Sequence, residues 1–161
     1  MNLIHPETKE SFKQLSLIFT VILLGIFLFA GFVVLFIITD SGGIVSENHK
    51  SYFILKWIFV GLVIVLIPFA IVSHRKYTDR IDKSLPLKIK LLKYRNSFIG
   101  KILIISFICM FNSVLLFIYG DLYLLIPLVL FIFYFLLNRP YIEKIAEELD
   151  LNYNEKSELK E

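Results

Sequence analysis

The amino-acid sequence predicts an all-α polytopic membrane protein, a single domain over residues 1–161 with four transmembrane helices in two consecutive hairpins. Three observations lead to this fold class. Hydrophobic residues make up 57% of the chain, which is more than a soluble domain of this size buries. They are gathered in four long runs separated by polar segments. The basic residues are concentrated in alternate connections between those runs.

A helix that crosses the hydrocarbon core needs about 20 mostly apolar residues, within a range of about 17 to 25. Four runs are predicted as transmembrane spans on this basis: residues 16–38, 53–72, 102–119 and 122–137. The second contains one charge, Lys56, near enough to its start for the ammonium to reach the interface. The fourth run is the shortest, and it fits a span if Gly120 and Asp121 form a tight turn before it.

The positions of Lys and Arg predict the orientation, because cytoplasmic connections are enriched in both. All but two of the 17 basic residues lie before the first span, between the second and third, or after the fourth; the exceptions are Lys50 and Lys56. We therefore predict a multi-pass protein of the cell inner (cytoplasmic) membrane with both termini cytoplasmic. Residues 1–15 form the N-terminal cytoplasmic segment, and residues 73–101 form a basic cytoplasmic segment that runs into the third helix.

The third helix is expected to extend well beyond its span. Apolar residues recur at spacings of three and four, as one helix face requires: Leu87, Leu91, Tyr94, Phe98, Ile102, Ile105 and Cys109. Since proline is tolerated in a first helical turn, one helix is predicted from Pro86 to Tyr119. The first helix is expected to begin near Pro6 for the same reason.

An amphipathic cytoplasmic helix is predicted over residues 140–151. Its apolar side carries Tyr141, Ile142, Ile145 and Leu149, and its polar side carries Glu143, Lys144, Glu147 and Glu148. Such a helix either lies on a membrane surface or partner, or caps the protein's own cytoplasmic helices, and we favour the cap. The polar residues 152–161 are expected to form a flexible tail.

A parallel two-plus-two repeat is a further hypothesis. The segment after the second span, Arg75–Leu87, aligns without gaps to Arg139–Leu151 after the fourth. Arg, Tyr, Ile and two Leu residues coincide. Two copies of a hairpin that both enter from the cytoplasm would be parallel repeats about an axis along the membrane normal. The alternative is that similar interfacial positions produced similar strings.

The spans themselves offer little chemistry. No ionisable side chain lies in the middle of any span, where proton and ion pathways usually have one. One stripe of weakly polar residues follows a face of the third helix: Ser106, Cys109, Asn112 and Ser113. It is either a substrate contact on a narrow polar path or, as we favour, a set of interhelical hydrogen bonds at a packing face.

The three histidines are expected at different places, with His5 and His74 cytoplasmic and His49 external. Zinc and haem need ligands at one depth, and no Ser–His–Asp set is expected within the membrane. The single cysteine cannot form an internal disulfide. We therefore expect no catalytic residue, no cofactor and no metal site, and we predict that the chain is not an enzyme.

The basic segment is a candidate for lipid-headgroup contacts. Its cations are Arg75, Lys76, Arg80, Lys83, Lys88, Lys90, Lys93 and Arg95. A cation near an anionic membrane surface contributes about 1 kcal/mol to binding. The alternative is plain topological anchoring, and nucleic-acid binding is not expected.

The start of the third helix, Tyr94-Arg95-Asn96-Ser97-Phe98-Ile99-Gly100-Lys101, and the Arg139-Pro140 exit from the fourth resemble a group of small four-span membrane proteins common in Bacteroidota. The resemblance is strongest in the second half of the chain. It implies the four-span fold and no activity. Members of that group carry a Glu early in the third helix, where this chain has Ser106, so the resemblance implies no acidic site here.

Three functions follow as hypotheses. The first is a non-catalytic accessory, assembly or interaction subunit, whose partners are the bilayer and either another membrane protein or further copies of the chain. The alternative is a small transporter or channel that forms its path only as an oligomer, with Asn112 at its narrowest point. The third is a membrane protein that binds anionic lipid through its basic face.

Overall fold

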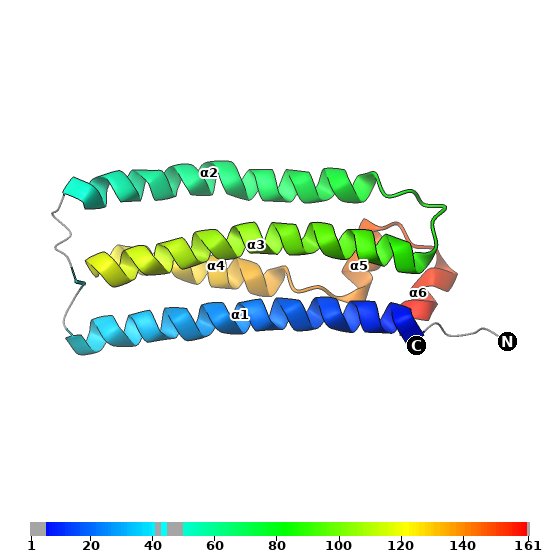
Figure 1. Ribbon diagram of the computed structural model, residues 1–161, viewed down its shortest axis with the longest axis horizontal. Coiled ribbons are helices and arrows are strands. Elements are labelled where there is room, and N and C mark those ends of the chain that lie inside the picture. The colour runs from blue at the N-terminus through cyan, green and yellow to red at the C-terminus, as the bar shows by residue number, and fades with distance from the viewer. Residues whose placement is uncertain (1–5, 41–42, 45–49, 161) are drawn as a thin grey trace.

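The computed structural model describes residues 6–40, 43–44 and 50–160, and the chain is helical, without strands, over these residues. Three long helices lie side by side (Figure 1): α1 (Pro6–Asp40), α2 (Lys50–Asp79) and α3 (Leu87–Tyr119). The described residues after α3 form four shorter elements: the 3-10 helix η1 (Leu122–Leu124), α4 (Leu125–Leu137), α5 (Ile142–Glu148) and α6 (Tyr153–Lys160). The predicted all-helical class is confirmed.

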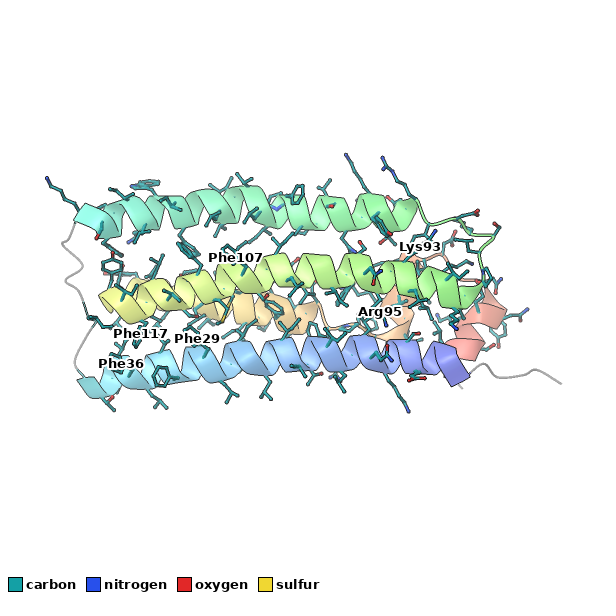
Figure 2. All side chains as sticks on the ribbon, in the orientation of Figure 1. Phe29, Phe36, Lys93, Arg95, Phe107 and Phe117 are labelled. Carbon is teal, nitrogen blue, oxygen red and sulfur yellow. The ribbon has the colours of Figure 1, made fainter. Side chains whose placement is uncertain are left out.

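Helix α3 is the centre of the bundle, since it packs on α1, α2 and α4. Half of its most apolar stretch (50%) is buried, against 22% in α1 and 11% in α2. All seven residues of the stripe from Leu87 to Cys109 are buried, as the helical spacing predicts. Near the other end of α3, Phe117 packs on Phe36 of α1, with ring centroids 4.8 Å apart (Figure 2).

Three helices, α1, α2 and α3, are each long and apolar enough to cross a membrane. Their outer faces expose large apolar side chains, such as Leu28 at 66% and Trp57 at 72%, as a lipid-facing surface does. The fourth predicted span is shorter. Helices η1 and α4 cover about 24 Å at 1.5 Å per residue, less than a hydrocarbon core of about 30 Å. They qualify as a span only together with α5, from which they bend by 81°.

The predicted tight turn at Gly120 and Asp121 is present. Gly120 has φ 66°, a left-handed conformation that favours glycine, and it ends α3 with a bond from its N–H to the Leu116 carbonyl. Asp121 then caps η1 by accepting from the Tyr123 N–H at 2.9 Å. Its other oxygen accepts from the Tyr52 hydroxyl and lies 3.3 Å from Lys56 Nζ. Lys56 is thus held by a buried carboxylate.

At the other end of the bundle, α1 begins, α2 passes into α3, and α5 and α6 lie close by (Figure 1). We call this the basic end, because the predicted basic segment lies there. Asp82 forms the turn between α2 and α3, where it accepts from the backbone N–H of Ser84 at 2.9 Å and from its hydroxyl at 2.8 Å. Pro86 then precedes the first turn of α3, so the single long helix predicted from this proline is confirmed.

The segments aligned in the proposed repeat differ in structure. Residues 75–79 continue α2 to its end, whereas residues 139–141 form a non-helical break between α4 and α5. Helix α4 is also much shorter than α2, with 13 residues against 30. The two segments are therefore similar in sequence but differ in backbone conformation.

A helix forms over residues 153–160, where the sequence predicts a flexible tail over residues 152–161. Helix α6 runs from Tyr153 to Lys160 and buries Leu159. Lys90 Nζ on α3 lies 2.6 Å from Oε1 of Glu155, and both side chains are largely buried, at 5% and 18% exposed. A polar sequence forms a stable helix here because an ion pair and one leucine attach it to the bundle.

Candidate functional site

His74 is the centre of a polar network at the basic end, where α2, α3 and α5 meet. The histidine is 6% exposed. Its Nδ1 lies 2.9 Å from the Ser97 hydroxyl on α3, and its Nε2 lies 3.4 Å from Oε2 of Glu148 on α5. The Tyr94 hydroxyl donates to the same carboxylate oxygen at 2.7 Å. A single carboxylate therefore connects three helices.

The orientation of Glu148 corrects the prediction for residues 140–151. Glu148 was expected on the polar, outward side, but it points inward beside Ile145 and Leu149, which are 0% and 5% exposed. Positions 145, 148 and 149 share one face at spacings of three and four. The face of α5 that holds these residues packs on the protein's own helices, which favours the cap over a surface-bound helix. Asp150, with φ 50°, ends α5.

The electrostatics of the network favour an ionised Glu148. Burial raises the pKa of this carboxyl, but hydrogen bonds with His74 and Tyr94 and the positive charge of Lys101 outweigh burial. The result is a pKa of about 2, below the ordinary 4.5. Glu148 is therefore a fixed negative charge at neutral pH.

A cavity of about 400 Å³ lies beside this network. Its lining comes from α2, α3, α5 and the end of α4: Ile71, His74, Arg75, Thr78, Asp79, Lys101, Tyr134, Asn138, Lys144, Glu147 and Glu148. Six of these side chains are formally charged at neutral pH, three of each sign. The site is thus polar, although it adjoins helices with apolar outer faces.

Three cations line the cavity without a carboxylate partner. Within the part of the chain that the structure describes, Arg75, Lys101 and Lys144 form no ion pair. Lys101 is the most unusual of them, because it is only 6% exposed and its Nζ lies 4.9 Å from the ring centroid of Phe98. Buried cations normally have a counter-charge. Only Lys101 is buried, since Arg75 is exposed and Lys144 is half-buried, and all three are available to an anion.

The same cavity holds an unsatisfied hydroxyl. Thr78 is 7% exposed, and its Oγ1 makes no hydrogen bond with any described residue. Thr78 follows Arg75 by three residues on α2, so these two side chains share one face of the helix. A buried hydroxyl without a partner costs about 1–3 kcal/mol, so a ligand that bonds to it would recover that cost.

Ser97, His74 and Glu148 are the residue types of a hydrolytic triad, which the sequence did not lead us to expect together. They meet at the basic end, outside the predicted spans. Acyl transfer also needs donors that stabilise an oxyanion, usually backbone N–H groups. Ser97 lies within the uninterrupted helix α3, where the backbone N–H groups bond within the helix. The arrangement therefore suits a structural network better than nucleophilic catalysis.

The eight cations predicted to contact lipid headgroups do not form one surface. Lys90 is buried and paired with Glu155, so it is not placed to contact a lipid headgroup as the sequence predicts. Lys83 pairs with Asp150, and Arg95 donates to Gln14 of α1 at 2.7 Å (Figure 2). The other five are Arg75, which lines the cavity, Lys76 and Arg80, which line a groove along α2, and the exposed Lys88 and Lys93.

The predicted polar stripe on α3 makes local bonds. Ser113 donates to the Cys109 carbonyl at 3.0 Å and Ser106 to the Leu103 carbonyl at 2.9 Å, both within α3. Asn112 donates to the Leu124 carbonyl at 3.0 Å. This bond fixes the start of α4 against α3, as expected of a packing face. The four residues do not make a continuous polar path.

The cavity residues were missed as a site because they come from four helices. A weak signal was present, since Tyr94, Ser97 and Lys101 recur at spacings of three and four, as do His74 and Thr78. Of the three histidines, only His74 lies within the described residues.

The chain matches no protein-family model, and neither its sequence nor its fold matches a curated protein or a solved structure. The geometry of the cavity is therefore the basis for a function.

Proposed function

We propose that this chain is a non-catalytic integral membrane protein that holds the headgroup of a membrane phospholipid in the cavity at its basic end. In this proposal both termini and the basic end face the cytoplasm, as the distribution of Lys and Arg favours. The cavity then lies at the level where lipid phosphates meet the cytoplasm. Basic pockets between transmembrane helices on that side commonly bind lipid headgroups.

The observation that carries the proposal is the unpaired, buried ammonium of Lys101. Taking an ammonium out of water costs several kcal/mol, and the face of Phe98 returns only about 1–2 kcal/mol. The nearby charge of Glu148 interacts with this ammonium but lies outside ion-pair distance, and a phosphate in the cavity would supply a counter-charge in direct contact. Arg75, from α2, and Lys144, from α5, line the same cavity and would add further donors. Arg is well suited to phosphate because its donors form a planar fork.

The proposal narrows the broader hypothesis of an accessory protein that acts through binding. It also replaces the dispersed basic face with a defined site. The oligomeric channel is not favoured, because it required Asn112 to line an open polar path, and that amide is bonded to the Leu124 carbonyl.

The test is native mass spectrometry of the protein in mild detergent, titrated with short-chain phosphatidylglycerol. Diacylglycerol with the same chains, which lacks the phosphate, is the comparison ligand. We expect selective binding of the phospholipid, and about a fivefold loss of affinity for each cation removed, at about 1 kcal/mol per charge. Arg75→Ala and Lys101→Met are the test variants. Lys93→Ala is the matched control, since Lys93 is exposed on α3 and does not line the cavity.

The proposal is refuted if the protein binds the two lipids equally. It is also refuted if both test variants bind phosphatidylglycerol as tightly as the control variant does. Orientation is tested separately with reporters fused at Ser46, a position outside the described residues, and at the C-terminus. A cytoplasmic reporter at Ser46 would overturn the proposed topology.

A further inference from the structure

We propose that the lipid held in the cavity is an aminophospholipid, whose headgroup carries a primary ammonium beyond its phosphate. This inference rests on the proposed function and adds the chemical class of the headgroup.

The cavity offers carboxylates as well as cations. Of its three acidic side chains, Glu148 is engaged by His74 and Tyr94. Asp79 and Glu147 form no hydrogen bond or ion pair with any described residue. Both are exposed. A headgroup with only negative charge would place its phosphate near these carboxylates, and like charges at close range are unfavourable. A headgroup with both signs of charge satisfies both sets of side chains.

The two sets are also arranged in depth. Helix α2 ends at Asp79, so Arg75 lies one turn, about 6 Å, deeper in the bundle. Lys101 lies 14 residues after the start of α3 at Leu87, which places it about 21 Å along that helix from the basic end. Asp79 is at the end of its helix, and Glu147 comes from α5, beyond the end of α4. Lys101 and Arg75 therefore lie deeper in the bundle than Asp79, and the carboxylate close to Lys101 is that of Glu148, which His74 and Tyr94 already engage.

A phosphoethanolamine headgroup has the same order of charges. Its phosphate is attached to glycerol at the membrane, and its ammonium extends toward the water. In our proposal Lys101 and Arg75 bind the phosphate, and the unpartnered Thr78 hydroxyl donates to a phosphate oxygen. Asp79 and Glu147 accept from the ammonium. A primary ammonium offers three donors, whereas the quaternary nitrogen of choline offers none, so phosphatidylcholine satisfies these carboxylates less well.

The experiment compares short-chain phosphatidylethanolamine, phosphatidylglycerol and phosphatidylcholine by native mass spectrometry of the full chain in mild detergent. We expect the wild type to bind phosphatidylethanolamine about tenfold more tightly than either other lipid, a difference of about 1.4 kcal/mol. The variant Asp79→Asn/Glu147→Gln is expected to lose most of this preference and to bind phosphatidylglycerol at least as tightly as before. Each single variant is measured too, so that one poorly folded protein does not decide the result. Glu10→Gln, an exposed carboxylate on α1, is the control and should keep the preference.

The outcomes separate this inference from the proposed function. Equal binding of phosphatidylethanolamine and phosphatidylglycerol by the wild type, with both weakened in Lys101→Met, overturns the aminophospholipid and leaves the phosphate site standing. If Lys101→Met and Arg75→Ala bind all three lipids as tightly as the wild type does, both the aminophospholipid and the phosphate site are overturned.

Free O-phosphoethanolamine and inorganic phosphate serve as competitors. We expect free phosphoethanolamine to compete with an affinity well below that of the lipid but above that of inorganic phosphate. Equal competition by the two overturns recognition of the amine, and a free headgroup that binds as tightly as the lipid overturns a membrane lipid as the ligand.

Discussion

Replacing Lys101 with methionine is expected to stabilise the lipid-free protein and to weaken its stabilisation by phospholipid. In the native chain an ammonium is 6% exposed, with Phe98 as its aromatic neighbour and no carboxylate in ion-pair contact among the described residues. Methionine keeps an unbranched side chain of similar length over the Phe98 ring and removes the charge.

The magnitude follows from three opposing terms. Desolvation of the ammonium costs several kcal/mol. The Phe98 ring returns about 1–2 kcal/mol, and the more distant charge of Glu148 about 1 kcal/mol. We therefore expect Lys101→Met to raise the free energy of unfolding by about 1–2 kcal/mol without lipid. A ligand at about one hundred times its dissociation constant stabilises the folded state by about 2.7 kcal/mol, and an affinity about fivefold weaker lowers this gain to about 1.8 kcal/mol. Phosphatidylethanolamine should therefore stabilise the wild type by about 0.9 kcal/mol more than the variant.

The assay is denaturant unfolding in mild detergent, followed by far-ultraviolet circular dichroism, with and without the short-chain lipid. Lys93→Met is the control, because an exposed lysine on the same helix should change stability by no more than about 0.5 kcal/mol. A lipid-free Lys101→Met that is less stable than the wild type, with a neutral control, would show that the ammonium is satisfied within the protein. Equal stabilisation of both proteins by lipid would also refute the reasoning.

Three further predictions follow from contacts at named residues. Lys90→Met leaves the Glu155 carboxylate without its ion-pair partner, so it is expected to lower the free energy of unfolding by about 3 kcal/mol and to expose α6 to hydrogen exchange. The double variant Lys90→Met/Glu155→Gln should recover most of the lost stability. Full protection of α6 from exchange in the single variant would contradict this prediction. Asn112→Leu should lower the free energy of unfolding by only about 1 kcal/mol, because the Oδ1 of Asn112 already has no partner. The variant should leave solute flux across reconstituted vesicles unchanged, and a changed flux would support the channel hypothesis. The pKa of Glu148 is lowered on folding from 4.5 to about 2, so its contribution to stability is complete above pH 4.5 and is lost as the pH falls from there toward 2. Glu148→Gln should therefore fall below the wild type in stability by much less at pH 2.5 than at pH 6, with about a quarter of the deficit remaining. A deficit that is the same at both pH values would exclude this cause.

The sequence predicted the local structure of this chain well where one helix decides it. The face of α3 from Leu87 to Cys109 is buried as its spacing requires, and Pro86 and Gly120 bound that helix. Such features depend on neighbours three or four residues away and on the backbone preferences of proline and glycine. Helix faces and helix ends of this kind can therefore be predicted from the sequence without knowledge of the fold.

The errors arose where distant segments meet. Glu148 was expected to face outward and Lys90 to contact lipid headgroups, but each is bonded to a partner more than fifty residues away. The tail was expected to be flexible because its own composition is polar, yet α6 is attached by Glu155 and Leu159. Local patterns do not contain these contacts.

The sequence by itself determined that this is a helical chain with long apolar helices suited to a membrane, because hydrophobic length and helical periodicity are local properties. Only the tertiary structure decided that His74, Lys101 and Glu148 share one polar site, and that unpaired cations and carboxylates line one cavity. Those side chains come from three different helices. They come together only because of how α2, α3 and α5 pack, and the proposed recognition of a lipid headgroup depends on that packing.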